Sequence, residues 1–525
     1  MALVAGDITS ALLSVSSLGI YIHAMFLSIS LGFPVVIGAL LFKYWKSGDG
    51  DYLKFAKTMT GVLGLNFALG AITGTLVEFG LVQAWPGSIF VIATFGFVPM
   101  TLELVAFVGE IVLLIWFIVS LGKVRPVYSV LVIVLYFIFA AASGVFITAV
   151  NSWMNAPWGT GSLPSAIYPF LPEYGPTAID SQSMIKLKVA LVNALFSSNP
   201  PSQLIQDPAI AKQIGLTLRD PLAALFSPYA IASALHNVTA GIIVGISFSL
   251  GGYAFKFFAK GDKKYLKVIR VILPVLLVLI IVQPVVFGDM MGKAVATYDP
   301  TKFALIEGAA HTKYDPLIAF LGYGDPSHPI TGFSDFENAT SGLGGKTLGD
   351  LVAAVLPNYT AGAAGELNLM RLGLDDLAKA ESNMPFVNAA YYSKIAFGIL
   401  DLISVAVLVT FLYRIPVLTK TGRRLLSPLG ERKAVMVLAV LVVASSVLVS
   451  SLGWAVREVG RKPWTVYGLI YPDEVVTPVA INPMVMVAFV GVFVVMAAVG
   501  VYGMYVFAAK PLKFMELLKK GAGVE

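Results

Sequence analysis

The amino-acid sequence predicts an all-α polytopic membrane protein with about nine transmembrane helices. Hydrophobic residues make up 57% of the 525 residues and charged residues only 13%, whereas soluble domains average about 45–50% and about 25%. Nine segments are apolar over the roughly 20 residues that a helix needs to cross a bilayer. So few charges leave too little polar surface for a soluble protein of this length, and we expect most of the chain to face lipid.

The spans are expected to be helices for two reasons. Aliphatic runs such as residues 272–282 favour strands by propensity, but segments longer than about 20 residues favour helix. Small residues, such as Gly70 and Gly74, suit close helix packing in lipid. The nine predicted spans are residues 17–43, 55–82, 92–120, 126–149, 229–255, 266–288, 387–413, 433–455 and 482–509.

Lysine and arginine predict the orientation. The connections after the first, third, fifth and seventh spans, together with the C-terminal tail, hold 22 of the 36 basic residues, whereas residues 1–16 and 83–91 hold none. The positive-inside rule then places the N-terminus outside and the C-terminus in the cytoplasm. Residues 1–16 lack a basic start, so no removable signal peptide is expected. The net charge of +6 is a topology signal, and we expect no nucleic-acid partner.

The spans divide the chain into five parts. These are helices 1–4, a first extra-cytoplasmic connection, helices 5–6, a second extra-cytoplasmic connection, and helices 7–9 with the tail. Connections of such length are usually functional or disordered, and the second contains a helix-like stretch from Pro300 to Ala310. The predicted boundaries of the five parts are 1–149, 150–228, 229–288, 289–386 and 387–525.

The third span carries two carboxyl groups. Glu103 and Glu110 are seven residues apart and therefore lie on one helix face. No lysine or arginine in that span neutralises them. One interpretation is a pair of protonated, hydrogen-bonded glutamic acids, and the other is a proton path or a metal ligand inside the bundle.

Histidine and cysteine narrow the possible chemistry. The chain has no cysteine, which excludes disulfides, thiolate nucleophiles, covalent c-type haem attachment and cysteine-ligated iron–sulfur clusters. A lone membrane histidine is more often a structural hydrogen-bonding group than a ligand. His23 and His236, however, fall in two different spans, and this arrangement favours a haem. His311 and His328 fall in the second long connection, where we expect them to be solvated.

Two further groups of charges lie in or beside spans. Lys394 and Asp401 share a helix face; they form an internal charge network or contact a haem propionate, or Asp401 makes only local hydrogen bonds. Residues 453–464 combine charges and aromatic rings at a helix end. A belt of tryptophan and snorkelling arginine explains Trp454 and its neighbours. Glu458 needs a further explanation, because it lies where the helix leaves the membrane.

Four motifs in order along the chain resemble those of subunit I of the cytochrome bd quinol oxidases. The resemblance covers nearly the whole chain, including the helix number and the long loop after helix six. In the last motif Lys462 replaces the glutamine of the family pattern GW-x-x-x-E-x-GRQPW. The motifs are Gly64–Gly70 continuing to Glu78–Phe79, Asn151–Pro157, Lys302–Glu307 and Gly453–Trp464.

The resemblance implies a role for several residues in the membrane. His23 would ligate one haem of a high-spin di-haem site and Glu458 the other. Glu103 would lie beside haem d, as a possible ligand of its iron, and Glu110 on the proton route to it. His236 would ligate a low-spin haem b. The implied cofactors are a low-spin haem b, a high-spin haem b, and haem d or a further haem b in its place.

The resemblance also implies the substrates and partners. Lys302 and Glu307 would contact a membrane quinol in the extra-cytoplasmic loop, with Glu307 accepting its proton. Arg461 would pair with a haem propionate, and Trp454 and Lys394 would border the cofactors. Oxygen is the second substrate. The implied protein partner is a second membrane subunit, either subunit II or a paralogue of subunit I, with room for small accessory subunits, in a prokaryotic cell membrane.

Two departures from the family pattern affect these assignments. The family has a methionine after Arg-Ile in helix seven, opposite the low-spin histidine, where this chain has Ala396. Alanine cannot ligate iron, and Met384 lies twelve residues away, roughly 18 Å along a helix. Either another side chain completes that haem, or it is five-coordinate. The spacing from Glu103 to Glu110 is one residue shorter than in the family.

The leading hypothesis is the catalytic subunit of a bd-type oxidase. It would oxidise quinol at the outer face and reduce oxygen to water with protons taken from the cytoplasm. A second hypothesis, motivated by Ala396, is a diverged non-catalytic paralogue that acts as a scaffold. A third is a cation-coupled transporter using Glu103 and Glu110, which leaves the two membrane histidines and the loop motif unexplained.

Overall fold

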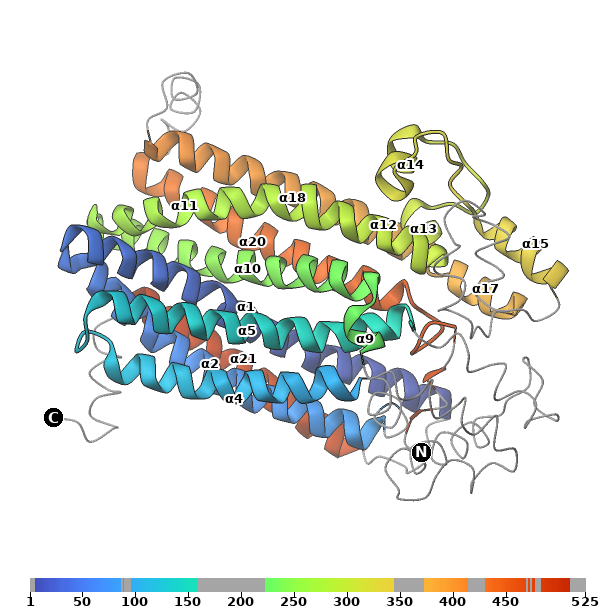
Figure 1. Ribbon diagram of the computed structural model, residues 1–525, viewed down its shortest axis with the longest axis horizontal. Coiled ribbons are helices and arrows are strands. Elements are labelled where there is room, and N and C mark those ends of the chain that lie inside the picture. Colours follow the sequence, from blue (N-terminus) through green and yellow to red (C-terminus); the bar gives the residue numbers. More distant parts are fainter. Residues whose placement is uncertain are drawn as a thin grey trace.

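The protein is a bundle of long helices with a cap of short helices at one end (Figure 1). The computed structural model describes residues 5–85, 88, 96–158, 222–343, 373–413, 430–468, 471–472, 475–476 and 483–509. Most of the first long connection and the Gly-rich stretch near residues 341–349 lie outside the described side chains. Within the described residues, nine helices are long and apolar enough to cross a membrane, which confirms the predicted number.

The long helices run side by side along the length of the molecule (Figure 1). We call the end at which α1 stops and α2 starts the basic end, and the opposite end, which carries the short helices, the loop end. The long helices are α1 (Ala5–Ser47), α2 (Gly50–Ala84), α4 (Phe97–Ser120), α5 (Pro126–Asn155), α10 (Pro228–Lys260), α11 (Lys264–Val282), α18 (Met384–Tyr413), α20 (Gly430–Val459) and α21 (Pro483–Ala509).

The loop end is built from short helices, most of them between α11 and α18, with α9 just before α10. The buried side chains of those between α11 and α18 form one apolar cluster with Trp464 and Tyr467, which follow α20. Helix α13 begins at Pro300 and ends at Gly308, whose φ of 63° is the left-handed cap that glycine favours. The short helices are α9 (Ala223–Phe226), α12 (Asp289–Tyr298), α13 (Pro300–Glu307), α14 (Pro316–Tyr323), α15 (Phe333–Leu343) and α17 (Leu374–Glu381).

Helices α1 and α10 form the centre of the bundle and approach each other through two glycines. A Cβ atom added at Gly32 would lie 2.5 Å from the backbone of Gly245. A Cβ atom added at Gly245 would collide with the carbonyl oxygen of Ser28. Helices in lipid pack closely where small residues let their backbones meet. This contact sets the distance between α1 and α10, the helices that carry His23 and His236.

The sixth span continues beyond its predicted end. Hydropathy predicts an end at residue 288, but the helix runs on through a π-helical turn (Gln283–Gly288) and α12 to Tyr298. Pro284 has no N–H to donate in an α-helical turn, and the wider π turn accommodates it. The extension is polar on one side, where Lys293 Nζ pairs with Asp289 at 2.7 Å. Hydropathy therefore located the end of the apolar segment and missed the end of the helix.

The close contact of α1 with α10 predicts that a single methyl group destabilises the bundle. Gly245→Ala should lower the unfolding temperature, because its Cβ has no space against α1. Gly398→Ala is the matched control, since nothing lies within 4 Å of its Cβ position, and alanine at an open helical site gains about 0.5–1 kcal/mol over glycine. Thermal unfolding of both variants in one detergent measures the difference. Equal stability of the two variants would contradict the proposed contact.

Candidate functional site

His23 faces the interior from the middle of α1 and is held in one orientation by α2. Its Nδ1 lies 3.1 Å from Thr73 Oγ1. The Thr73 hydroxyl donates its own proton to the carbonyl oxygen of Leu69 at 2.9 Å, so its oxygen accepts from His23 Nδ1–H. This tautomer leaves the lone pair on Nε2, the nitrogen that a metal would bind. Gly74 makes room for the ring, because a Cβ there would lie 2.8 Å from His23 Cε1.

His236 lies in the third turn of α10, beside the π-helical turn of the sixth span. The Gln283 amide nitrogen is 3.2 Å from His236 Nδ1 and 3.3 Å from Nε2. One amide therefore reaches both ring nitrogens and donates to whichever carries the lone pair. π turns recur at functional sites because they re-aim a side chain. Gln283 was not among the predicted site residues, since no spacing in the sequence relates it to His236.

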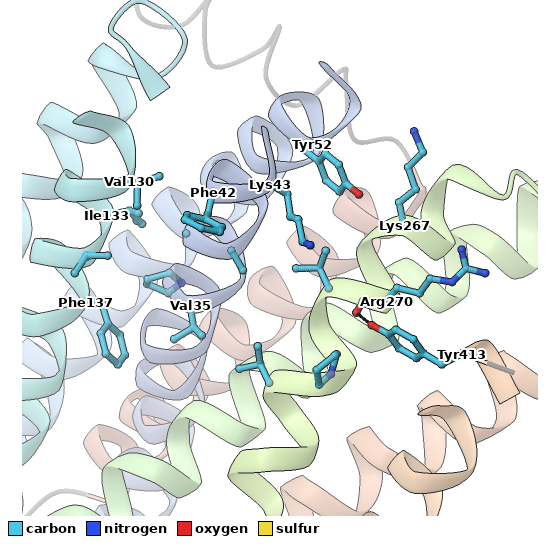
Figure 2. Close-up of a pocket in the computed structure, with 17 residues that line it drawn as sticks. Val35, Phe42, Lys43, Tyr52, Val130, Ile133, Phe137, Lys267, Arg270 and Tyr413 are labelled. Carbon is cyan, nitrogen blue, oxygen red and sulfur yellow. Dashed lines mark hydrogen bonds between the residues drawn. The ribbon is translucent and has the colours of Figure 1, made fainter. Parts of the chain in front are cut away.

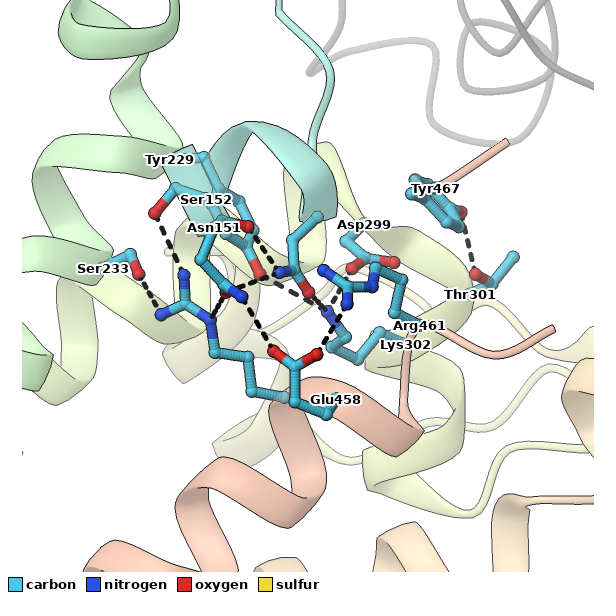
Figure 3. Close-up of polar contacts among 12 residues, drawn as sticks. Asn151, Ser152, Tyr229, Ser233, Asp299, Thr301, Lys302, Glu458, Arg461 and Tyr467 are labelled. Atoms are coloured by element: carbon cyan, nitrogen blue, oxygen red, sulfur yellow. Dashed lines mark hydrogen bonds and ion pairs between the residues drawn. The ribbon is translucent and has the colours of Figure 1, made fainter. Parts of the chain in front are cut away.

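Glu458 lies in the last turn of α20 and is bound by two other elements of the site (Figure 3). Asn151 Nδ2, at the end of α5, donates to Glu458 Oε1 at 3.1 Å. Arg461 Nη2 donates to Glu458 Oε2 at 2.6 Å. The Glu458 side chain nevertheless remains 36% exposed. Its carboxylate is therefore oriented by two donors and still has an open side.

Arg457, one residue before Glu458, joins three long helices. Its guanidinium donates to Asn151 Oδ1 at 2.5 Å, to Ser152 Oγ at 3.1 Å and to Ser233 Oγ at 2.5 Å. These partners come from α5 and α10. The guanidinium carbon also lies 5.4 Å from the centre of the Trp454 ring. Trp454 thus packs against a charged group of the site, and Arg457 was not among the predicted site residues.

Arg461 is a buried guanidinium that is only partly paired. It is 4% exposed, and its Nε and Nη1 atoms have no hydrogen-bond partner among the described residues. Buried donors are normally paired, so these two unpaired nitrogen atoms leave Arg461 able to bind an anionic group such as a carboxylate. Next to it, burial and the Arg461 charge lower the pKa of Lys462 to about 8. At neutral pH Lys462 still carries its charge, and together with Arg457 and Arg461 it gives the surroundings of Glu458 a net positive charge.

Lys302 lies in α13 and is enclosed by polar partners. It forms a buried ion pair with Asp299, and its Nζ donates to Asn155 Oδ1 at 2.6 Å and to Tyr229 Oη at 3.5 Å. Lys302 is 2% exposed. Burial raises the pKa of Asp299, although the charge of Lys302 opposes the rise. The structure thus places Lys302 inside a network, where the predicted direct contact with quinol would require displacing one of these partners.

Asn155 connects the Lys302 pair to Glu458. Its Nδ2 donates to Asn151 Oδ1 at 3.2 Å, and Asn151 in turn binds Glu458. The chain of contacts from Asp299 through Lys302, Asn155 and Asn151 to Glu458 is continuous (Figure 3). The motif Asn151–Pro157 was recognised in the sequence, but the roles of its two asparagines were not.

Glu307 lies at the last position of α13, nearer to the surface than Lys302. Its Oε2 accepts from Tyr392 Oη at 2.9 Å, and the Lys313 ammonium donates to its backbone carbonyl. The side chain is buried, and this burial raises the pKa of the carboxyl, whereas the hydrogen bond from Tyr392 opposes the rise. A carboxyl with a raised pKa, held by a tyrosine at the loop end, is suited to accept a proton at neutral pH.

The two carboxyl groups of α4 lie against α5. Ser143 Oγ donates to Glu103 Oε1 at 3.0 Å. Glu110 is buried with 5% exposure, and Glu103 is half-buried. A serine hydroxyl can both donate and accept, so Ser143 supplies a third protonatable or proton-relaying group beside the pair. Ser143 was not among the predicted site residues.

The remaining predicted residues occupy separate places. Lys394 Nζ lies 4.9 Å from the centre of the Tyr391 ring. Asp401 accepts from Ser446 Oγ of α20 at 2.7 Å, so its hydrogen bond joins two helices and is not the local one offered as an alternative. His311 is exposed, as predicted for a solvated residue, whereas His328 is half-buried, with its ring 4.2 Å from that of Tyr323.

The donor set fits a haem better than a bare metal ion. Within the described part of the chain, no group of three or more His, Cys, Asp or Glu side chains could hold a metal ion. A haem needs only one or two protein ligands, because the porphyrin supplies the other four. His23 with its free Nε2, the oriented Glu458 carboxylate, and the unpaired N–H groups of Arg461 for a propionate meet that need.

Comparisons with known proteins agree with this fold. Residues 14–512 match the sequence model of the family described as cytochrome bd terminal oxidase subunit I. Over 500 residues the chain is 22% identical to a Bacillus subtilis (strain 168) protein provisionally named cytochrome bd menaquinol oxidase subunit I, covering 93% of this chain and 94% of that protein. It is also 22% identical, over 508 residues, to cytochrome bd ubiquinol oxidase subunit 1 of the same organism, covering 95% and 91%.

A solved structure shows the same fold. The bd oxidase from Geobacillus thermodenitrificans superimposes with a TM-score of 0.68 at 17% identity, covering 95% of this chain and 98% of that chain. The predicted family is therefore confirmed, together with the all-helical architecture. The roles of individual site residues remain predictions.

The buried pair of Lys302 and Asp299 predicts a strong, non-additive effect on stability. Lys302→Met leaves Asp299 buried without its counter-charge, which typically costs about 3–5 kcal/mol. The double variant Lys302→Met with Asp299→Leu should recover much of that loss, since neither charge is then left alone. Thermal unfolding of the purified protein provides the measurement.

The exposed pair of Lys293 and Asp289, with side chains 42% and 30% exposed, gives the control. Lys293→Met should change the free energy of unfolding by no more than about 1 kcal/mol. If Lys302→Met were as mild as Lys293→Met, the buried pair would not hold the loop end together.

Proposed function

The chain belongs to the cytochrome bd terminal oxidase subunit I family, and we propose that it is the haem-bearing catalytic subunit of a quinol:oxygen oxidoreductase. The observation that carries the proposal is the continuous polar network between Lys302, in the helix predicted to contact quinol, and the pair of Glu458 and Arg461. This network connects the proposed quinol site with the proposed haem ligand.

Three residues would hold the cofactors, and a fourth would balance their charge. His23 and Glu458 would bind the two haems of the oxygen site, a high-spin haem b and haem d (or a further haem b), and His236 a low-spin haem b. Arg461 would pair with a propionate. The haems supply the electron transfer and the oxygen chemistry when bound. The protein residues orient them, exclude water and handle protons.

Glu307 is the base proposed for quinol oxidation. Quinol loses two protons and two electrons when it becomes quinone. Two quinols therefore supply the four electrons that turn one O₂ into two waters; their own four protons are released at the outer face, and the four protons needed for water are taken from the cytoplasm. Glu307 accepts a quinol proton, Tyr392 orients its carboxylate, and Lys313 holds the adjacent backbone. Lys302 acts as a positioning residue, because its ammonium group is occupied by Asp299 and Asn155.

Glu110, Ser143 and Glu103 are proposed to carry protons toward the oxygen site. They lie in neighbouring helices inside the membrane, with Ser143 bonded to Glu103. In the proposed topology the basic end faces the cytoplasm and the loop end faces outward. Quinol protons would then leave outside while oxygen consumes protons from inside, which separates charge across the membrane without a pump.

The proposed assembly follows from the family. A second membrane subunit, either subunit II or a paralogue of subunit I, would accompany the chain in a prokaryotic cell membrane, with small accessory subunits as further components. The relatives are named for menaquinol and for ubiquinol, so a membrane quinol is the proposed donor.

A second candidate function is that of a non-catalytic paralogue. Ala396 favours it, because the family pattern has an iron-ligating methionine there. The two candidate functions differ at Glu307: a catalytic subunit would need it for quinol turnover, whereas a scaffold would not.

Haem content tests the proposed ligands. His23→Ala and His236→Ala should each lose haem, measured as the pyridine haemochrome per protein, because each removes an iron ligand. His328→Ala is the control, since His328 lies in the loop beside Tyr323. Haem absent from the carefully purified parent protein, or unchanged in both membrane variants, would refute the proposal.

Quinol-driven oxygen uptake tests the base. Glu307→Gln should lower the rate by at least roughly 100-fold, as expected for loss of a general base. Glu381→Gln, an acidic position at the end of α17 at the same end of the molecule, should leave the rate nearly unchanged. An active parent with an unaffected Glu307→Gln variant would exclude Glu307 as the base, and an inactive haem-containing parent would favour the scaffold.

The pH dependence should follow the state of Glu307. Because only the carboxylate accepts a proton, the rate should rise with pH through the raised pKa of Glu307. Tyr392→Phe removes a donor that stabilises the carboxylate, so the pKa should rise further and the acid limb of the profile should move to higher pH. A shift to lower pH, or none, would show that this hydrogen bond does not control the base.

A further inference from the structure

A groove at the basic end has no role in the proposed reaction. It has a volume of about 690 Å³ and lies between α5 and α11, both of which pack on α1 (Figure 2). Sites for small ligands typically measure about 300–1,000 Å³. The groove is lined by residues of α1, α5 and α11, with Tyr52 of α2 and Tyr413 of α18 beside them.

The walls of the groove are apolar and about as long as one leaflet of a membrane. Aliphatic and aromatic side chains of α1, α5 and α11 line it away from the rim. From Pro34 to Lys43 the groove follows ten residues of α1, and the nine steps between them measure about 14 Å along the helix. Half of a hydrocarbon core is about 15 Å. The groove therefore matches the length of an acyl chain that enters from the basic end.

The rim of the groove is basic and hydroxylated. Lys43, Lys267, Arg270, Tyr52 and Tyr413 gather at one end, nearest the membrane surface (Figure 2). Lys267 adds no positive charge to the rim, since its Nζ pairs with two carboxylates, Asp49 at 2.8 Å and Asp51 at 2.9 Å. Lys43 and Arg270 make no ion pair with an acid among the described residues. Two positive charges at the mouth of an apolar groove are complementary to an anionic headgroup.

The rim is held in place by a hydrogen bond that follows from a proline. Pro274 in α11 has no N–H, so the carbonyl oxygen of Arg270, four residues earlier, has no helical donor. Tyr413 Oη, from the end of α18, donates to this oxygen at 2.5 Å. Tyr413 and the backbone of Arg270 are thus fixed together at the rim, while the Arg270 guanidinium stays available.

We propose that this groove binds one anionic phospholipid of the membrane, with its phosphate between Lys43 and Arg270 and an acyl chain along α1. A quinone headgroup is neutral and would leave both cations unpaired. A free phosphate ion would leave the apolar walls uncovered. The lipid would connect α5, α1 and α11 at the end of the bundle where α5 and α11 diverge, and this role does not depend on the oxidase reaction.

Lipid retention by the purified full complex tests the site. Delipidated protein is mixed with equal amounts of phosphatidylglycerol and phosphatidylcholine of the same chain length, and the bound lipid is measured by native mass spectrometry. Phosphatidylglycerol should be retained selectively. The double variant Lys43→Gln with Arg270→Gln should weaken this retention by roughly 30-fold, given the usual contribution of each basic residue near an anionic lipid.

Two further variants distinguish the groove from the general membrane surface. Lys264→Gln is the control for the loss of a nearby positive charge, compared with the single variants Lys43→Gln and Arg270→Gln. Lys264 lies one turn before Lys267, pairs with Asp262 at 2.8 Å and does not line the groove, so retention should be unchanged. Ala39→Phe keeps both cations and fills the apolar wall, and it should reduce retention as well. It keeps the proposal testable if the double variant does not fold.

Several results would overturn the proposal. Equal retention of the two lipids would show annular lipid only. Displacement of phosphatidylglycerol by millimolar inorganic phosphate would show an anion site without a role for the acyl chain. A co-purified quinone that is lost in Ala39→Phe but kept in the double variant would show a second quinone site in place of a lipid site.

Discussion

The loop end depends on one constraint, which is that buried charges must be paired. Taking an ion out of water costs several kcal/mol even after relaxation, and five ions lie together here: Asp299, Lys302, Arg457, Glu458 and Arg461. Their partners come from α5, α10, α13 and α20. Each of these helices must therefore end where its side chains can reach the others, and this requirement fixes the geometry of the loop end more tightly than apolar packing alone would.

The same network explains why the candidate quinol site and the candidate haem site keep a fixed position relative to each other. Helix α13 carries Glu307 at its end and Lys302 five residues earlier, about one and a half turns. Lys302 is bound into the network that ends at Glu458. Any movement of α13 relative to α5 and α10 would break the hydrogen bonds from Lys302 to Asn155 and Tyr229, so the position of the proposed base is fixed relative to the proposed haem ligand.

Sequence reasoning recovered what depends on composition and on local spacing. The nine helices follow from hydropathy, and His23, Glu458 and Glu307 were predicted as site residues because each is a costly residue type in its place or part of a motif. The pairings between distant segments were not predictable. Gln283 reaches His236 across 47 residues, and Asn151 reaches Glu458 across 307. No periodicity relates such positions, because the contacts arise only when the helices pack.

The buried charges also bear on the choice between an enzyme and a scaffold. A buried ion network is weak evidence for stability, because apolar residues of similar volume often stabilise as well or better. A scaffold subunit could therefore be built with an apolar loop end. This chain instead gathers five ions there, three of them buried, and leaves two nitrogen atoms of Arg461 without a partner among the described residues. Such an arrangement is explained if an anionic ligand pairs with Arg461. Ala396 lies in α18, a helix that carries none of these five residues.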